Sequence, residues 1–132
     1  MSEAALERTV RFRASHRYHA LGAPGGDADG PLTRSHAHDW AVRVTVRGPL
    51  DAHGFVVDLP ALEARLAEVV GGLDGTDLEQ AFAELRDGPL QPSTETLARL
   101  LFERLAPLVP APARLERVRV EESPELAGSW PA

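Results

Sequence analysis

Residues 36–48 read HAHDWAVRVTVRG, and this stretch decides how the rest of the chain is interpreted. From residue 40 onward, large apolar residues alternate with smaller or polar ones, which is the pattern of a strand with one buried face. The apolar positions are Trp40, Val42, Val44 and Val46. Because residues i and i+2 of a strand point to the same face, His36 and His38 present two imidazoles side by side.

A second strand is predicted over residues 7–16, ERTVRFRASH, which alternate in the same way and end on His16. The Gly- and Pro-rich segment 20–34 is interpreted as a long loop. If the two strands pair as a hairpin around it, His16 arrives beside the other two histidines. Three neutral imidazoles suit Zn²⁺ and leave a fourth position open for water or substrate. The alternative is a set of exposed polar residues at a strand edge, since an HxH pair alone is common.

Two amphipathic helices are predicted further along the chain. Apolar residues recur at helical spacing over 59–70 and again over 97–108. Asp58 is the expected N-cap of the first helix, and Ser93 or Thr94 that of the second. Each helix therefore carries one apolar face that must pack against the strands.

The remaining segments complete a small α+β layer. A turn of helix is expected within 78–86, a last strand over 115–121, and an irregular tail from Pro124. Three or four strands with two helices on one face form one domain, 1–132. The edges of so small a sheet need covering, so we expect the chain to form a homo-oligomer.

Composition excludes several classes of protein. The chain has 132 residues, a net charge of −6 and no cysteine, so disulfides, thiolate metal sites and a cysteine nucleophile are ruled out. Such an acidic chain is a poor candidate for nucleic-acid binding. No apolar run is long enough to span a membrane, and the N-terminus lacks the apolar centre of a secretory signal. We therefore expect a cytoplasmic protein without a nucleic-acid or membrane partner.

Six short segments, in this order, resemble the 6-pyruvoyltetrahydropterin synthase family and its bacterial relative, 6-carboxytetrahydropterin synthase. They are FRASH at 12–16, HAHDW at 36–40, GFVVD at 54–58, LD at 73–74, PSTETL at 92–97 and VRVEESP at 118–124. No single segment is decisive, but together they cover nearly the whole chain.

The resemblance implies a fold, a metal and a binding pocket. The family adopts the tunnelling fold, an antiparallel four-stranded sheet with two helices on one face, and assembles into trimers and hexamers. Its zinc ligands correspond to His16, His36 and His38. Its pterin-anchoring glutamate corresponds to Glu122, and the hydroxyl pair that helps to hold the ring corresponds to Ser93 and Thr94. Without the resemblance, Glu122 would be interpreted as a solvated charge at a strand end.

The chain departs from the family pattern at the groups that move protons. The family's cysteine lies shortly before HxH, where this chain reads GPLTRS over 30–35. In the family's Asp-His pair, Asp74 remains as the candidate catalytic residue, but Gly75 replaces the histidine. Substitute bases are Asp74 itself, His19, His53 or a hydroxide on the metal.

Two functions are therefore open. The first is a diverged zinc-dependent lyase or cyclase that acts on a pterin or another carbonyl-bearing small molecule. The alternative is a non-catalytic homologue that binds zinc and a ligand and acts as a sensor or partner subunit. General acid–base assistance is typically worth about 10²–10⁴-fold in rate, so loss of the base weakens catalysis while leaving the metal site intact.

Overall fold

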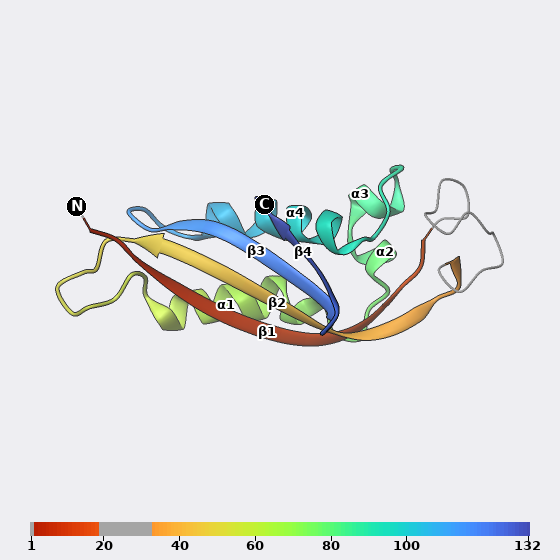
Figure 1. Ribbon diagram of the computed structural model, residues 1–132, viewed down its shortest axis with the longest axis horizontal. Helices are drawn as coiled ribbons and strands as arrows, with labels where there is room; N and C mark the ends of the chain where they lie inside the picture. Colours follow the sequence, from red (N-terminus) through yellow and green to blue (C-terminus); the bar gives the residue numbers. More distant parts are fainter. Residues whose placement is uncertain (1, 19–32) are drawn as a thin grey trace.

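The computed structural model describes residues 2–18 and 33–132, and its strands form one antiparallel sheet (Figure 1). The strands lie side by side in sequence order as β1 (Ala4–His16), β2 (His36–Gly48), β3 (Arg114–Ser123) and β4 (Leu126–Trp130). The predicted hairpin is confirmed, because β1 and β2 pair without interruption from Ala4 opposite Gly48 to His16 opposite His36.

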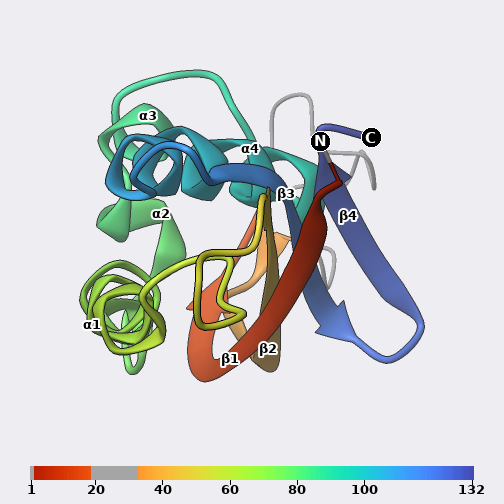
Figure 2. The ribbon, with the colours of Figure 1, turned by 90° about the vertical axis from the view of Figure 1, so that its left-hand side faces the viewer.

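Two long helices cover one face of this sheet (Figure 2). They are α1 (Leu59–Val69) and α4 (Thr94–Leu105), and the shorter elements are η2 (Gly71–Leu73), α2 (Leu78–Ala81), α3 (Ala83–Arg86) and η3 (Ala106–Leu108). The two N-caps are as expected. Asp58 accepts from the Ala61 amide, and Ser93 accepts from the Thr96 amide. None of the described helices is long and apolar enough to cross a lipid bilayer.

The core lies between the helices and the even-numbered side chains of β1 and β2. Phe12, Trp40 and Val44 on the strands are buried together with leucines such as Leu66 and Leu101 on the helices. The odd-numbered side chains point to the other face, because successive residues of a strand alternate. That face carries ion pairs, including Arg119 with Glu121 at 2.8 Å. The same alternation places all three predicted metal ligands on the helix-covered face.

Three boundaries differ from the sequence expectations. The tail from Pro124 is not irregular, since residues 126–130 form β4 and pair with β3. The first strand begins at Ala4 instead of residue 7. The helical turn expected within 78–86 is two short helices, because the buried Phe82 adopts an extended backbone between them. Most of the predicted loop 20–34 lies outside the described residues.

Candidate metal centre

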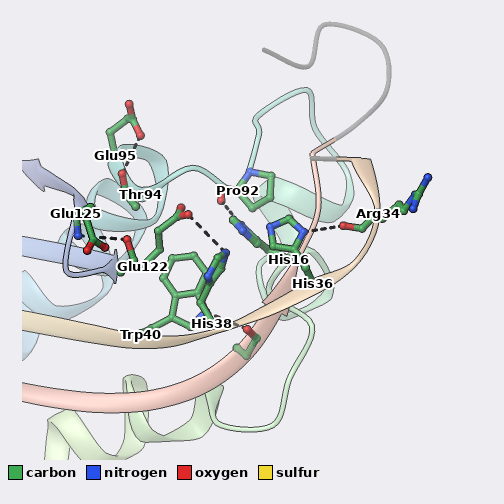
Figure 3. A network of polar contacts seen from close by, with 12 residues as sticks. His16, Arg34, His36, His38, Trp40, Pro92, Thr94, Glu95, Glu122 and Glu125 are labelled. Atoms are coloured by element: carbon green, nitrogen blue, oxygen red, sulfur yellow. Dashed lines mark hydrogen bonds and ion pairs between the residues drawn. The ribbon is translucent and has the colours of Figure 1, made fainter. Parts of the chain in front are cut away.

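Three imidazoles converge where β1 ends and β2 begins, as predicted (Figure 3). His16 and His36 are directly paired across the two strands, and His38 follows two residues later on the same face. Each histidine offers one nitrogen, and the three nitrogens lie within 4.8 Å of one another. The rings stand at steep angles to each other, with centroids 4.6–5.0 Å apart. The rings therefore surround a common point.

Backbone carbonyls hold two of these rings in place. His16 Nδ1 lies 2.9 Å from the carbonyl oxygen of Pro92, and His36 Nδ1 lies 2.7 Å from that of Arg34. A carbonyl oxygen only accepts, so Nδ1 carries the hydrogen in both rings and Nε2 keeps its lone pair. Metal-binding histidines are commonly oriented by such a bond on the nitrogen that does not bind the metal.

The buried position of His16 keeps its imidazole neutral. The side chain is only 1% exposed. Burial is the largest cause that lowers its pKa from 6.5 to about 4; the neighbouring His36 and His38 act in the same direction, while the bond to Pro92 opposes the shift. A histidine must be neutral to bind a metal, so His16 is ready to do so at neutral pH.

Several buried polar atoms at this point have no hydrogen-bond partner among the described residues. They are His16 Nε2, His38 Nε2 and Glu122 Oε1. Leaving a buried polar group unsatisfied costs about 1–3 kcal/mol, so their concentration indicates a site built for a ligand. A set of imidazole nitrogens beside a carboxylate suits a divalent ion such as Zn²⁺.

Trp40 packs against two of the imidazoles and fixes their position. Its ring centroid lies 4.9 Å from that of His16 and 5.4 Å from that of His38, nearly perpendicular to both. Its indole nitrogen donates to the carbonyl oxygen of Ala14 at 3.0 Å, so the one polar group of the side chain already has a hydrogen-bond partner. Rigid packing of this kind holds ligands close to a productive geometry.

The predicted pocket residues lie on neighbouring elements. Glu122, near the end of β3, places Oε2 3.5 Å from His38 Nε2. The Ser93 hydroxyl caps α4 and donates to the Thr96 hydroxyl at 3.0 Å. Thr94 is buried, and its hydroxyl donates to Glu95 Oε1 at 3.0 Å (Figure 3). Their role in binding a substrate stays a prediction.

Other groups at the site were not identified from the sequence. The half-buried ring of Tyr18 lies 5.5 Å from the ring of His16. Burial, followed by the charges of Glu122 and Glu95, raises the pKa of Tyr18, so its hydroxyl stays protonated. The carbonyls of Pro92 and Arg34 carry no side-chain signal, so no sequence pattern could have pointed to them.

Asp74 does not join the imidazoles within this chain. Its carboxylate accepts from the Arg13 amide at 2.9 Å, beside a hollow of about 390 Å³ that also borders Ser15 and Ala37. The side chains of these last two residues alternate with those of the histidines, so the hollow opens toward the opposite face of the sheet. Gly75 has a φ of +77°, and an added Cβ would meet no atom within 4 Å.

Of the two remaining histidines, the structure describes His53. His53 is exposed in a turn, where its amide donates to Asp51, and it is not among the clustered residues. His19 lies outside the described residues.

Comparisons with known proteins agree on one family. The family model described as 6-pyruvoyl tetrahydropterin synthase matches residues 5–130. The 6-pyruvoyl tetrahydrobiopterin synthase of Poecilia reticulata is 30% identical over 127 residues, covering 89% of this chain and 83% of that protein. A protein of Halobacterium salinarum, named as a probable 6-carboxy-5,6,7,8-tetrahydropterin synthase, is 28% identical and covers 91% of this chain and 81% of its own length.

Solved structures give the same result for the fold. The 6-pyruvoyl tetrahydropterin synthase of Caenorhabditis elegans superposes with a TM-score of 0.84 at 26% identity, covering 98% of this chain and 96% of that one. The Plasmodium vivax enzyme superposes with a TM-score of 0.70 at 18% identity, covering 98% and 97%. The tunnelling fold is therefore shared over essentially the full length.

Proposed function

The chain belongs to the 6-pyruvoyl tetrahydropterin synthase family, and from that membership we propose a diverged zinc-dependent enzyme of the lyase or cyclase type. Its substrate is a pterin or another small molecule that bears a carbonyl group. The convergence of three imidazoles, two of them held by backbone carbonyls, carries this proposal. A chain that bound neither a metal nor a ligand would have no reason to keep this arrangement.

Each residue of the site has a distinct task in the proposal. His16, His36 and His38 hold the metal through neutral nitrogens. When bound, Zn²⁺ supplies a Lewis acid that polarises a carbonyl oxygen. Glu122 anchors the substrate, because a carboxylate accepts two N–H bonds from the guanidine-like edge of a pterin. We propose that the hydroxyls of Ser93 and of the buried Thr94 help Glu122 to hold the ring, as the family resemblance implies.

Proton transfer is where this chain differs from the family pattern. Without the cysteine and the histidine, Asp74 is the remaining carboxylate of the family's proton-transfer pair. Its carboxylate is held by the Arg13 amide at the edge of β1, and we propose that it serves the metal site of a neighbouring copy. We therefore expect this chain to convert the family's substrate slowly. Its own reaction should depend less on a general base.

A non-catalytic role is the second candidate. The observation that favours it is Gly75, where a positive φ places the backbone in a region that L side chains rarely adopt. A sensor or partner subunit would keep the metal and the pocket while giving up proton transfer. Both candidates predict zinc, so turnover is what separates them.

Metal content is the first test. We expect about one zinc per chain after purification without added chelator, measured by elemental analysis. His36→Ala should reduce that content strongly, because one of three ligands is lost. His53→Ala, at an exposed position outside the cluster, is the matched control and should keep it. Zinc-free wild-type protein, or equal content in both variants, would refute the proposal.

Turnover of dihydroneopterin triphosphate is the second test. General acid–base assistance is worth about 10²–10⁴-fold, so the rate should fall below that of a cysteine-containing relative by a factor in this range. Asp74→Asn should lower any remaining rate, since the amide keeps the bond to Arg13 but takes up no proton. Binding of neopterin without turnover of any tested substrate would favour the non-catalytic role.

A further inference from the structure

Glu122 lies beside His38, and this position suits a second role in addition to substrate anchoring. Both side chains are largely buried, with 14% and 25% of their surface exposed. His38 Nε2 and Glu122 Oε2 are 3.5 Å apart, yet His38 Nε2 makes no hydrogen bond. The separation is longer than that of an ordinary hydrogen bond, although the two atoms are neighbours. This geometry is expected when two groups aim at a third point.

The separation of the two atoms matches that of two ligands on one ion. Zinc–nitrogen and zinc–oxygen bonds are about 2.0–2.2 Å long, so two ligands of a tetrahedral ion lie about 3.4 Å apart. The distance of 3.5 Å between His38 Nε2 and Glu122 Oε2 agrees with this spacing. The other carboxylate oxygen, Oε1, is buried and has no partner in the part of the chain that the structure describes, so no competing bond from there holds Glu122 in place.

Charge supports the same assignment. Three neutral imidazoles leave the full double charge of a divalent ion uncompensated in a largely buried site, and burying net charge is costly. Glu122 is the carboxylate that the structure pairs with one of the three imidazoles. Trp40 adds no ligand, because its indole nitrogen donates to the Ala14 carbonyl.

We propose that Glu122 is a fourth protein ligand of the metal in the substrate-free protein, completing a His₃Glu site. The proposal rests on the metal site of the proposed function. It gives Glu122 two exclusive roles, since a carboxylate bound to the metal is not free to accept N–H bonds from a substrate. A substrate that engages Glu122 then opens the coordination position that its own carbonyl group needs.

Cobalt(II) absorption spectroscopy on the full chain tests this assignment. The protein is stripped with a chelator and titrated with Co²⁺, whose visible bands report the number and type of ligands. Glu122→Gln and Glu122→Ala should both change the bands. Both should also weaken Co²⁺ binding at least about tenfold, which is the lower end of the effect of removing even an outer-shell partner.

Glu121→Gln is the matched control, because Glu121 is the adjacent residue, faces the other side of the sheet and pairs with Arg119 at 2.8 Å. It should leave the bands and the affinity unchanged. Wild-type bands in both Glu122 variants, whatever their affinity, would overturn the assignment while leaving the three-histidine site standing. Failure of the wild-type protein to bind Co²⁺ would instead overturn the proposed function itself.

Discussion

At the scale of single residues, His16 combines two properties that rarely coincide. It is the most buried of the three imidazoles, and its Nε2 has no partner within residues 2–18 and 33–132. A buried polar atom without a partner lowers the stability of the fold, and here that atom lies where the three rings meet. The Pro92 carbonyl fixes the ring, so the unsatisfied nitrogen faces the shared site. His16 is therefore placed to bind a ligand, and this placement lowers the stability of the metal-free fold.

The pH dependence of stability should report this cost. The pKa of His16 is about 4 when folded and 6.5 in the reference state, so the unfolded chain takes up a proton first as the pH falls. The contribution of neutral His16 is complete above pH 6.5 and is lost between pH 6.5 and 4. At about 1.4 kcal/mol per pKa unit, the loss approaches about 3.5 kcal/mol.

Urea denaturation of the metal-free protein across this pH range measures the effect. His16→Asn keeps a donor for the Pro92 carbonyl but does not titrate, so its free energy of unfolding should fall less steeply toward acid. His53→Asn changes an exposed histidine and should retain the wild-type slope. Equal slopes for His16→Asn and the wild type would contradict the prediction.

At the scale of elements, the sequence predicted the features that depend on period and capping. The alternation in 7–16 and 36–48 identified both long strands, and their pairing then brought the histidines together. The caps Asp58 and Ser93 were correctly identified, because side-chain capping is local chemistry. Supports made by backbone, such as the Pro92 carbonyl, depend on tertiary contact and leave no pattern.

Strand β4, which the sequence did not predict, also depends on tertiary contacts. Residues 126–130 read LAGSW, which is too short and too poor in β-branched residues to predict a strand. The strand forms because its backbone pairs with β3 and packs closely on α4. The close approach occurs at Gly128, where an added Cβ would lie 2.6 Å from the Glu95 amide and 2.7 Å from the Thr94 hydroxyl.

Gly128→Ala should therefore separate β4 from the start of α4. Both contacts are tighter than side chains tolerate, so we expect a loss of about 1–3 kcal/mol in the free energy of unfolding, measured by urea denaturation. Because Thr94 must move, neopterin binding should weaken as well. Gly72→Ala is the control, since its added Cβ meets no atom within 4 Å. Equal destabilisation by the two substitutions would rule out a specific clash.

At the scale of the whole molecule, the two edges of the sheet are unequal. The C-terminal end of β1 is covered by its own chain, because the Arg13 amide donates to Asp74 and the Ser15 amide donates to the Thr76 carbonyl. No such bonds are made by the earlier part of β1 within the described residues, and β4 forms the other edge. Open stretches at both edges of one sheet favour pairing between copies, which is the basis for expecting a homo-oligomer; its size, a trimer or hexamer, is what the family resemblance implies.

The direction of the amides in β1 allows this expectation to be tested without breaking the sheet. Arg13 and Ser15 direct their amides away from β2, and the pairing of β1 with β2 is regular, so the amide of Glu7 points the same way. Glu7→Pro removes that outward donor and leaves the ladder to β2 intact. Light scattering should give a wild-type mass of three or six chains of 14.2 kDa, and a smaller assembly for Glu7→Pro. Glu7→Ala keeps the amide and should assemble as the wild type does. A wild-type monomer, or an unchanged mass for the proline variant, would show that this edge does not join the copies.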